Sequence, residues 1–124
     1  MRILVVDDDY DMVETVKLFL DAQGFEVTTA YDGETGVASA ARAAPDLCLL
    51  DLVLPDMDGR ELTKAIRGVT GCARTRVVLL TAMGGRKAVE AYLGDGENSA
   101  DAYVEKPVNF KELKSLIEKL LDTR

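Results

Sequence analysis

The 124-residue sequence contains no histidine and no tryptophan, only two cysteines and three prolines, and no long apolar run. The absence of histidine excludes a Ser-His-Asp triad, a histidine metal site and phosphohistidine within these residues. The two cysteines form neither a disulfide framework nor a recognised zinc spacing. Because no apolar stretch approaches the roughly 18 residues of a membrane span, we expect no membrane segment and a cytoplasmic protein. The remaining chemistry must use aspartate, lysine, threonine and the backbone.

Acidic residues outnumber basic residues by 22 to 15, which gives a net charge of −7 at pH 7. This charge disfavours nonspecific binding to nucleic acid or to an anionic membrane. We therefore expect no direct nucleic-acid partner and no membrane partner, and expect proteins or small cations to bind instead. The length and the 48% apolar content indicate one globular domain spanning residues 1–124.

Short apolar stretches alternate with helical patterns along the whole chain. Several stretches are apolar at every position, as in "ILVV" and "VVLL", which is typical of strands buried between two helix layers. The alternation predicts a doubly wound α/β fold with a parallel sheet. The expected strands are 3–6, 25–30, 47–50, 77–81 and 102–105. The expected helices are 10–22, 33–43, 59–69, 86–93 and 110–121.

Polar side chains stand where the predicted strands end. Asp7 and Asp8 follow the first strand, and Asp51 ends the third. Thr81 ends the fourth strand, and Lys106 follows the fifth. Carboxyl ends of parallel strands share one edge of a doubly wound sheet, where ligands bind. Converging carboxylates there would be stabilised by a hard divalent cation, so we expect magnesium, with manganese as a substitute.

Four motifs occur in order, each at a predicted strand: "VVDDD" (5–9), "LLDLVLPDMDG" (49–59), "VVLLTA" (77–82) and "YVEKP" (103–107). With these motifs, essentially the whole chain resembles the response regulator receiver family of two-component signalling. The resemblance implies a flavodoxin-like sheet of order 2-1-3-4-5 and five helices. We expect a receiver domain alone over residues 1–124, with no effector domain among them, either as a stand-alone regulator or as a part of a longer protein. The resemblance also implies a signalling domain that is not an enzyme and catalyses only its own phosphorylation and dephosphorylation.

The resemblance assigns the acidic residues to an acceptor and a metal site. Asp51 would accept a phosphoryl group from a histidine kinase or a histidine phosphotransfer protein. Asp7 and Asp8 would be the acidic pair of the magnesium site, with Asp8 a direct ligand and Asp7 acting mainly through water. The Val53 carbonyl would complete the protein ligands. A magnesium ion and a nearby ammonium are the groups that make a carboxylate an effective nucleophile toward phosphorus.

Residues of the last two strand ends would respond to phosphorylation. By the resemblance, Lys106 and the Ala82 amide would contact the phosphoryl group, and Thr81 would hydrogen-bond to it. Thr81 and Tyr103 would act as the switch pair that alters the face formed by the fourth helix, fifth strand and fifth helix. In the family, the peptide bond between Lys106 and Pro107 is typically cis.

Two positions depart from the family in a way that bears on water access. Val53 and Met83 stand where receivers often carry residues that orient an attacking water, and neither can do so by hydrogen bonding. We therefore expect slow loss of phosphate from Asp51. Ser99 to Asp101 stand where the family often has Gly-Ala-Asp, in a segment of unusual length. We therefore do not infer the binding partner of this chain from the family. We also do not find the charged pattern that is typical of the dimer common among DNA-binding members.

Other interpretations remain for most of these residues. Asp8 and Asp11 could be first-turn acids of a helix, Thr81 a strand-end hydroxyl and Tyr103 a core aromatic residue. A magnesium-dependent phosphohydrolase of the haloacid-dehalogenase type is the alternative from the enzyme class, but Val53 stands where it needs an acid. A receiver-like module that signals without phosphate is the third hypothesis. A group of basic residues is expected to be a solvated face: Arg60, Lys64, Arg67, Arg74 and Arg76.

Overall fold

A computed structural model of the chain describes residues 1–82 and 100–122. Its five strands form one parallel sheet in the order β2-β1-β3-β4-β5, so the predicted α/β fold and strand order are confirmed. The strands are β1 (Arg2–Val6), β2 (Glu26–Ala30), β3 (Leu47–Asp51), β4 (Arg76–Thr81) and β5 (Ala102–Glu105).

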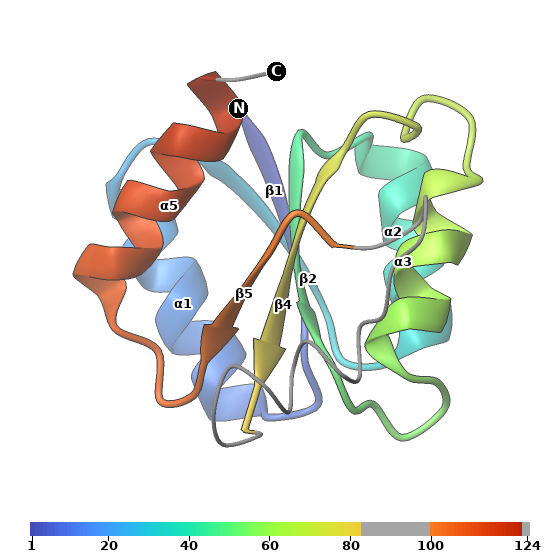
Figure 1. Ribbon diagram of the computed structural model, residues 1–124, viewed down its shortest axis with the longest axis horizontal. Coiled ribbons are helices and arrows are strands. Elements are labelled where there is room, and N and C mark those ends of the chain that lie inside the picture. Colours follow the sequence, from blue (N-terminus) through green and yellow to red (C-terminus); the bar gives the residue numbers. More distant parts are fainter. Residues whose placement is uncertain (83–99, 123–124) are drawn as a thin grey trace.

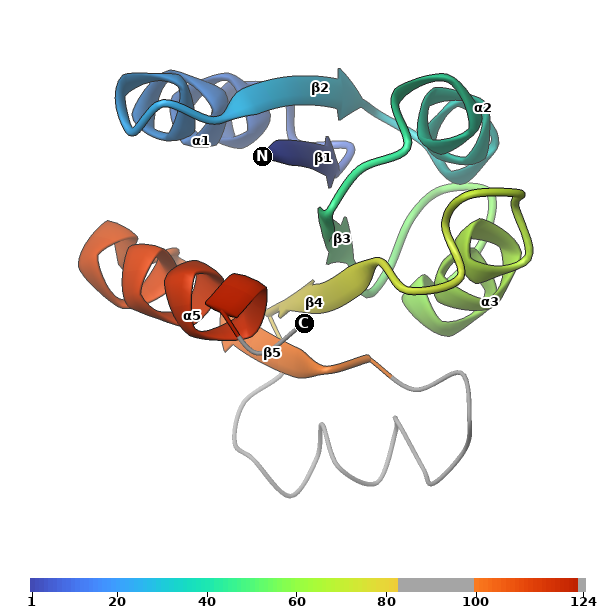
Figure 2. The same cartoon turned by 90° about the horizontal axis from the view of Figure 1, so that it is seen from above.

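Helices cover both faces of the sheet. Helices α1 (Tyr10–Ala22) and α5 (Phe110–Asp122) lie on one face, and α2 (Gly33–Ala43) and α3 (Gly59–Arg67) lie on the other (Figures 1 and 2). The helix expected at 86–93 lies outside the described residues. None of the described helices is long and apolar enough to cross a membrane.

The sheet divides the apolar core into two clusters. Leu4 and Val6 of β1 pack on the α2–α3 side, whereas Ile3 and Val5 pack on the α1–α5 side. All four side chains are at most 1% exposed. Successive side chains of a strand point to opposite faces, so a strand covered on both faces must be apolar at every position. This geometry explains the unbroken apolar stretches of the sequence.

An aspartate or an asparagine caps the N-terminus of each of the four described helices. Asp9 accepts a hydrogen bond from Met12 N at 3.1 Å, and Asp32 accepts one from Thr35 N at 2.8 Å. Asp58 caps α3 and Asn109 caps α5 in the same way. Each cap pairs an amide that lacks a partner within its helix. The short turns therefore hold the helix N-termini beside the carboxyl ends of the strands.

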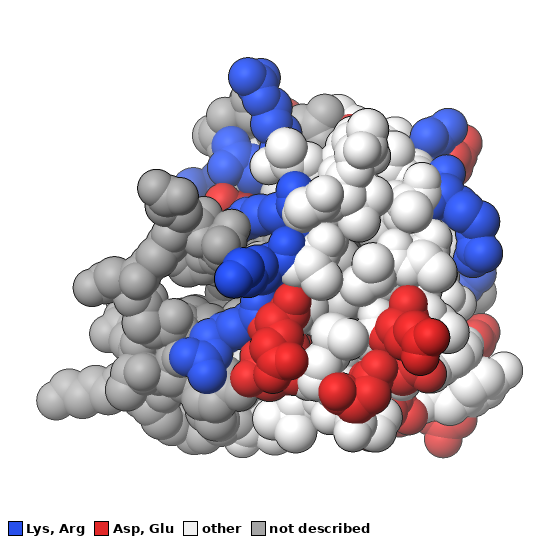
Figure 3. Space-filling view, turned by 90° about the vertical axis from the view of Figure 1, so that its right-hand side faces the viewer, with Lys and Arg blue, Asp and Glu red and all other residues white. Residues whose placement is uncertain are grey.

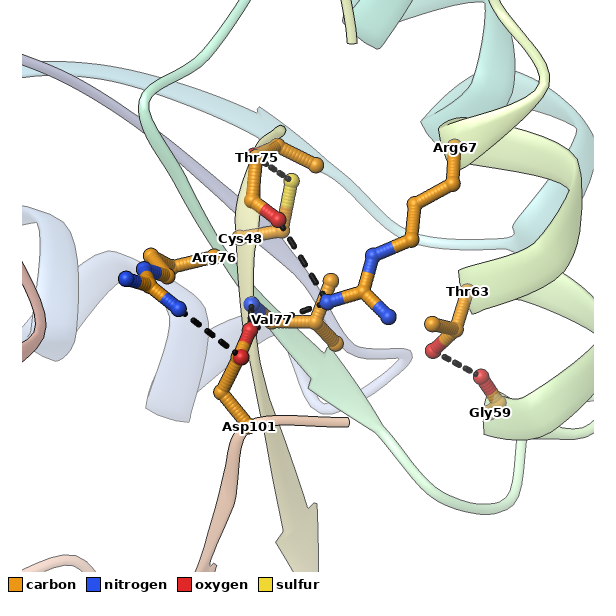
Figure 4. Close-up of polar contacts among 8 residues, drawn as sticks. All are labelled: Cys48, Gly59, Thr63, Arg67, Thr75, Arg76, Val77 and Asp101. Atoms are coloured by element: carbon orange, nitrogen blue, oxygen red, sulfur yellow. Dashed lines mark hydrogen bonds and ion pairs between the residues drawn. The ribbon is translucent and has the colours of Figure 1, made fainter. Parts of the chain in front are cut away.

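An ion-pair cluster lies at the amino ends of β4 and β5, away from the acidic residues that follow the strands (Figure 4). Asp101 accepts hydrogen bonds from Arg67 at 2.9 Å, from Arg76 at 3.2 Å and from Val77 N at 2.8 Å. The Asp101 amide donates to the Val77 carbonyl at 2.8 Å. Asp101 thus joins the start of β5 to β4 and to the end of α3.

The expectation of a fully solvated basic face is wrong for two of its members. The side chains of Arg67 and Arg76 are only 15% and 27% exposed, and both pair with Asp101. Arg60 and Lys64 of α3 are exposed, as expected. Figure 3 shows lysine and arginine side chains in two groups, separated by other residues, on the side of the molecule that carries α2 and α3. Part of the expected basic face therefore has a structural role.

Candidate acidic site at the strand ends

Three carboxylates meet at the carboxyl ends of β1 and β3. One oxygen each from Asp7, Asp8 and Asp51 lies within 4.8 Å of the others. Asp7 is fully buried and Asp51 is 6% exposed, whereas Asp8 is exposed to solvent. β1 and β3 are hydrogen-bonded neighbours, with Val6 opposite Leu50, so the residues that follow Val6 and Leu50 come together. The structure therefore brings together the three acids that the sequence predicted to converge.

Lys106 brings a positive charge to this acidic group. Its Nζ lies 2.7 Å from Asp7 Oδ2 and 3.4 Å from Asp51 Oδ1. Lys106 is the first residue after β5, and its amide donates to the Thr81 carbonyl of β4 at 2.8 Å. This bond continues the pairing of the two strands by one residue. The peptide bond between Lys106 and Pro107 is cis. Burial lowers the pKa of Lys106, but the carboxylates of Asp7 and Asp51 outweigh this effect and raise it overall.

Asp51 is a buried carboxyl group in a predominantly negative environment. Burial raises its pKa to about 6, and the nearby charge of Asp7 acts in the same direction. The charge of Lys106 and the Val53 amide, which donates to Asp51 Oδ1 at 3.3 Å, oppose this rise. The ionised form of Asp51 is thus destabilised by its surroundings, and added positive charge would stabilise it.

The three acids fit a divalent cation with oxygen ligands. Asp7 Oδ2 is buried and has no hydrogen-bond partner among the described residues, although it lies within ion-pair distance of Lys106. Its other oxygen, Oδ1, accepts a hydrogen bond from Asp9 N at 3.0 Å. One ammonium offsets only part of the charge of three carboxylates, and a divalent cation would offset the rest. Magnesium prefers such hard oxygen ligands.

The remaining predicted site residues that the structure describes lie on β4 and β5 or directly after β3 and β4. Thr81, at the end of β4, is only 2% exposed, and Ala82 after it is exposed. Tyr103 of β5 is partly buried and packs against the core on the α2–α3 side. Val53 lies just after Asp51, and its side chain is 63% exposed. Met83 lies outside the described residues.

Two acidic residues that support this fold were not predicted from the sequence as structural residues, Asp56 and Asp101. Asp56 accepts hydrogen bonds from Gly33 N at 2.8 Å and from Glu34 N at 2.9 Å. Asp101 was noted only as part of a motif, although it holds two arginines. The available signal for Asp56 was its place in a turn after a buried strand, but nothing local identifies a partner 23 residues away.

Comparisons with known proteins agree with this geometry. The family profile described as "Response regulator receiver domain" matches residues 3–118. The chain is 39% identical over 90% of its length to the DNA-binding response regulator MtrA of Mycolicibacterium smegmatis, and 34% identical over 97% to RpaA of Synechocystis, a DNA-binding dual master transcriptional regulator. It spans 46% and 48% of those two proteins.

Solved structures show the same architecture over nearly the whole chain. The chemotaxis response regulator CheY4 of Vibrio cholerae superposes with a TM-score of 0.85 at 28% identity, covering 96% of this chain and 97% of that one. A CheY-like receiver domain protein from Methanospirillum hungatei superposes with a TM-score of 0.84 at 32% identity, covering 98% and 94%. The similarity therefore extends through all the described strands and helices.

The expectation of no nucleic-acid partner is contradicted. MtrA and RpaA, which this chain resembles, are both described as DNA-binding. The expectation rested on the net charge of −7, which belongs to 124 residues only. Since the chain spans about half the length of these relatives, its charge says nothing about their other half.

Proposed function

This chain belongs to the response regulator receiver domain family, and from this premise we propose that Asp51 is its phosphoryl acceptor. Such domains are signalling parts of two-component response regulators. The observation that carries the proposal is the meeting of Asp7, Asp8 and Asp51, together with an ammonium 3.4 Å from Asp51. Asp7 and Asp51 are both buried, lie near Lys106 and accept a hydrogen bond from an amide, but only the Asp51 side chain keeps some exposure, 9% against 0% for Asp7.

In the proposed reaction a carboxylate oxygen of Asp51 attacks the phosphorus of a phosphohistidine on a partner kinase or phosphotransfer protein. The new bond joins this oxygen to phosphorus, and the bond between phosphorus and the histidine nitrogen breaks. Lys106, whose side chain already lies beside Asp51, would pair with the phosphoryl oxygens. Thr81 ends the adjacent strand β4 and Ala82 follows it; the Thr81 hydroxyl and the Ala82 amide would donate hydrogen bonds to the same oxygens.

Asp7, Asp8, Asp51 and the Val53 carbonyl would hold Mg²⁺. When bound, the ion supplies positive charge that offsets the charge of the acids and of the incoming phosphoryl group. The burial of Asp7 and the hydrogen bond between Asp9 N and Asp7 Oδ1 keep this carboxylate oriented toward the site. The division into a direct ligand, Asp8, and a water-mediated one, Asp7, stays a prediction.

Phosphorylation would act on the face beside β5. Thr81 and Tyr103 lie on adjacent strands, at the end of β4 and within β5. A new hydrogen bond between Thr81 and the phosphoryl group would favour one of two pre-existing arrangements of this face. The DNA-binding described for MtrA and RpaA suggests that such a change controls DNA binding in a regulator that contains this chain. Cytoplasmic location stays a prediction, and the two unpaired thiols, Cys48 and Cys72, agree with it.

The test is intact mass before and after incubation with acetyl phosphate, with and without Mg²⁺. We expect one added phosphoryl group on the wild type that requires Mg²⁺, and none on Asp51→Asn. Far-UV circular dichroism of the variant controls for folding. A folded wild type that gains no mass would contradict the proposal and favour a module that signals without phosphate.

A further inference from the structure

The loop that follows the acceptor is closed at its base. Gly59 N donates to the Leu52 carbonyl at 2.7 Å, and Leu54 N donates to the Met57 carbonyl at 3.2 Å. Val53 and Asp58 form an antiparallel bridge between these two bonds. The position of the Val53 backbone, which donates to Asp51 Oδ1, is therefore set by the loop as a unit. Any group that anchors the loop also anchors this backbone.

Asp56, near the tip of the loop, is attached to helix α2. Its Oδ1 accepts from Gly33 N at 2.8 Å, and its Oδ2 accepts from Glu34 N at 2.9 Å. These amides belong to the first two residues of α2, where the helix dipole also favours a negative charge. The same two hydrogen bonds lower the pKa of Asp56, so the carboxylate is ionised at neutral pH.

Met57, the residue after Asp56, also contacts helix α2. A Cβ on Gly33 would lie 2.4 Å from Met57 Cγ and 2.5 Å from its sulfur, so the Met57 side chain packs directly on Gly33 and would have to shift if a larger residue stood there. Met57 packs against the core on the α2–α3 side. The loop thus rests on α2 through one apolar contact and two charge-assisted hydrogen bonds.

Helix α2 already has a cap of its own. Asp32 accepts hydrogen bonds from Thr35 N at 2.8 Å and from Thr35 Oγ1 at 2.6 Å. Asp56 therefore adds something that Asp32 does not, namely a connection between α2 and the loop beside the acceptor. The two aspartates cap one helix, but only Asp56 joins it to a distant segment.

We propose that Asp56 is a positioning residue for the metal site, which holds the Val53 backbone in place through its two hydrogen bonds to α2. The inference rests on the proposed function, because that proposal is what assigns the Val53 carbonyl as a metal ligand. Loss of Asp56 leaves the loop closed at its base but releases its tip. The Val53 carbonyl is then held less firmly, and the ion binds more weakly.

The test compares Asp56→Ala with Asp32→Ala, which each remove one carboxylate and one cap of the same helix. Binding of Mn²⁺ is measured by electron paramagnetic resonance, and binding of Mg²⁺ by calorimetry. We expect the Kd of Asp56→Ala to rise about tenfold, the lower end of the range for groups that orient a metal ligand. Asp32→Ala should stay within about twofold of the wild type. Asp56→Asn keeps one acceptor oxygen and should lie between them.

Phosphorylation by acetyl phosphate gives a second readout. At saturating Mg²⁺ the rate of Asp56→Ala should return to within about twofold of the wild type, while the Mg²⁺ concentration for half-maximal rate rises. Equal Kd values for Asp56→Ala and the wild type, or equal losses in both alanine variants, would overturn the inference. A wild type that is not phosphorylated at all would instead contradict the proposed function.

Discussion

Lys106 forms an ion pair with Asp7 at 2.7 Å, shorter than the 3.4 Å that separates its ammonium from Asp51. One positive charge is thus shared by two carboxylates, of which Asp7 is fully buried. The lysine side chain is 23% exposed and Asp8 is exposed, so the cluster is partly open to solvent. Without a bound cation, Lys106 is the principal group that offsets the charge of both acids among the described residues.

Replacement of this ammonium should destabilise the metal-free protein. In Lys106→Met the side chain keeps a similar length but leaves Asp7 and Asp51 without a nearby cation. We expect the free energy of unfolding at pH 7 in a chelating buffer to fall by about 1–3 kcal/mol. Urea unfolding followed by circular dichroism measures this, since the chain has no tryptophan. Added Mg²⁺ should stabilise the variant more than the wild type, and equal stability in chelator would contradict the argument.

Asp51→Asn should have the opposite effect on stability. The pKa of Asp51 is raised to about 6 by burial and by Asp7, above the ordinary value of about 3.9. Between these values the folded state binds more protons than the unfolded state, so this group makes stability fall as pH rises from about 4 to 6. Lys106 keeps its shorter contact with Asp7 in the variant.

We therefore expect Asp51→Asn to be about 1–2 kcal/mol more stable than the wild type at pH 7 in metal-free buffer. The difference should shrink toward pH 4, where Asp51 is protonated in the folded wild type and about half protonated in the unfolded wild type. Urea unfolding at several pH values checks the trend. A variant that is less stable at pH 7, or a difference that grows toward acid, would contradict it.

The acidic site was predictable from the sequence because its members stand at strand ends. A parallel sheet brings the carboxyl ends of its strands to one edge, so Asp7, Asp51 and Lys106 meet whatever the details of packing. The buried strands were equally predictable, since a strand covered on both faces is apolar throughout. Their exact limits were not: β1 begins at Arg2, opposite Glu26, because backbone pairing continues beyond the apolar residues.

The supports of the site could not be predicted in the same way. Asp56 and Gly33 are 23 residues apart, and Arg67 and Asp101 are 34 apart. Polar residues in turns have no periodicity that identifies a distant partner, and their pairing depends on how α2, α3 and β5 come together. The strand pattern predicts which residues share an edge, but not which side chain reaches which amide.

Val53→Asn should shorten the lifetime of the phosphorylated protein. The Val53 side chain is 63% exposed beside Asp51 and offers no hydrogen bond to a water molecule. An amide there could orient a water for attack on phosphorus, and we expect loss of phosphate to become about tenfold faster. Decay of the phosphorylated mass after removal of acetyl phosphate measures the rate. Val53→Ala is the matched control, because it is smaller but equally unable to orient water; the same acceleration in both variants would contradict the explanation.

Replacement of Asp101, at the amino ends of β4 and β5, should change the stability of the protein and not its phosphorylation. Its side chain is 22% exposed and accepts from two arginines and from Val77 N. Asp101→Ala removes all three contacts, and we expect a loss of about 2–3 kcal/mol in the free energy of unfolding. Asp101→Asn retains an acceptor for the Val77 amide and should lose less.

Lys17 and Asp21 provide the control for Asp101. They form an i,i+4 pair at 2.6 Å on α1, but their side chains are 36% and 41% exposed. Solvent screens such a pair, so Asp21→Asn should cost less than about 0.5 kcal/mol. Both sets of variants are compared by urea unfolding at the same salt concentration. If Asp101→Ala cost no more than Asp21→Asn, the cluster in Figure 4 would not stabilise the junction of α3, β4 and β5. A loss confined to Asp101→Ala would show that the Val77 hydrogen bond, more than the arginine charges, holds the start of β5.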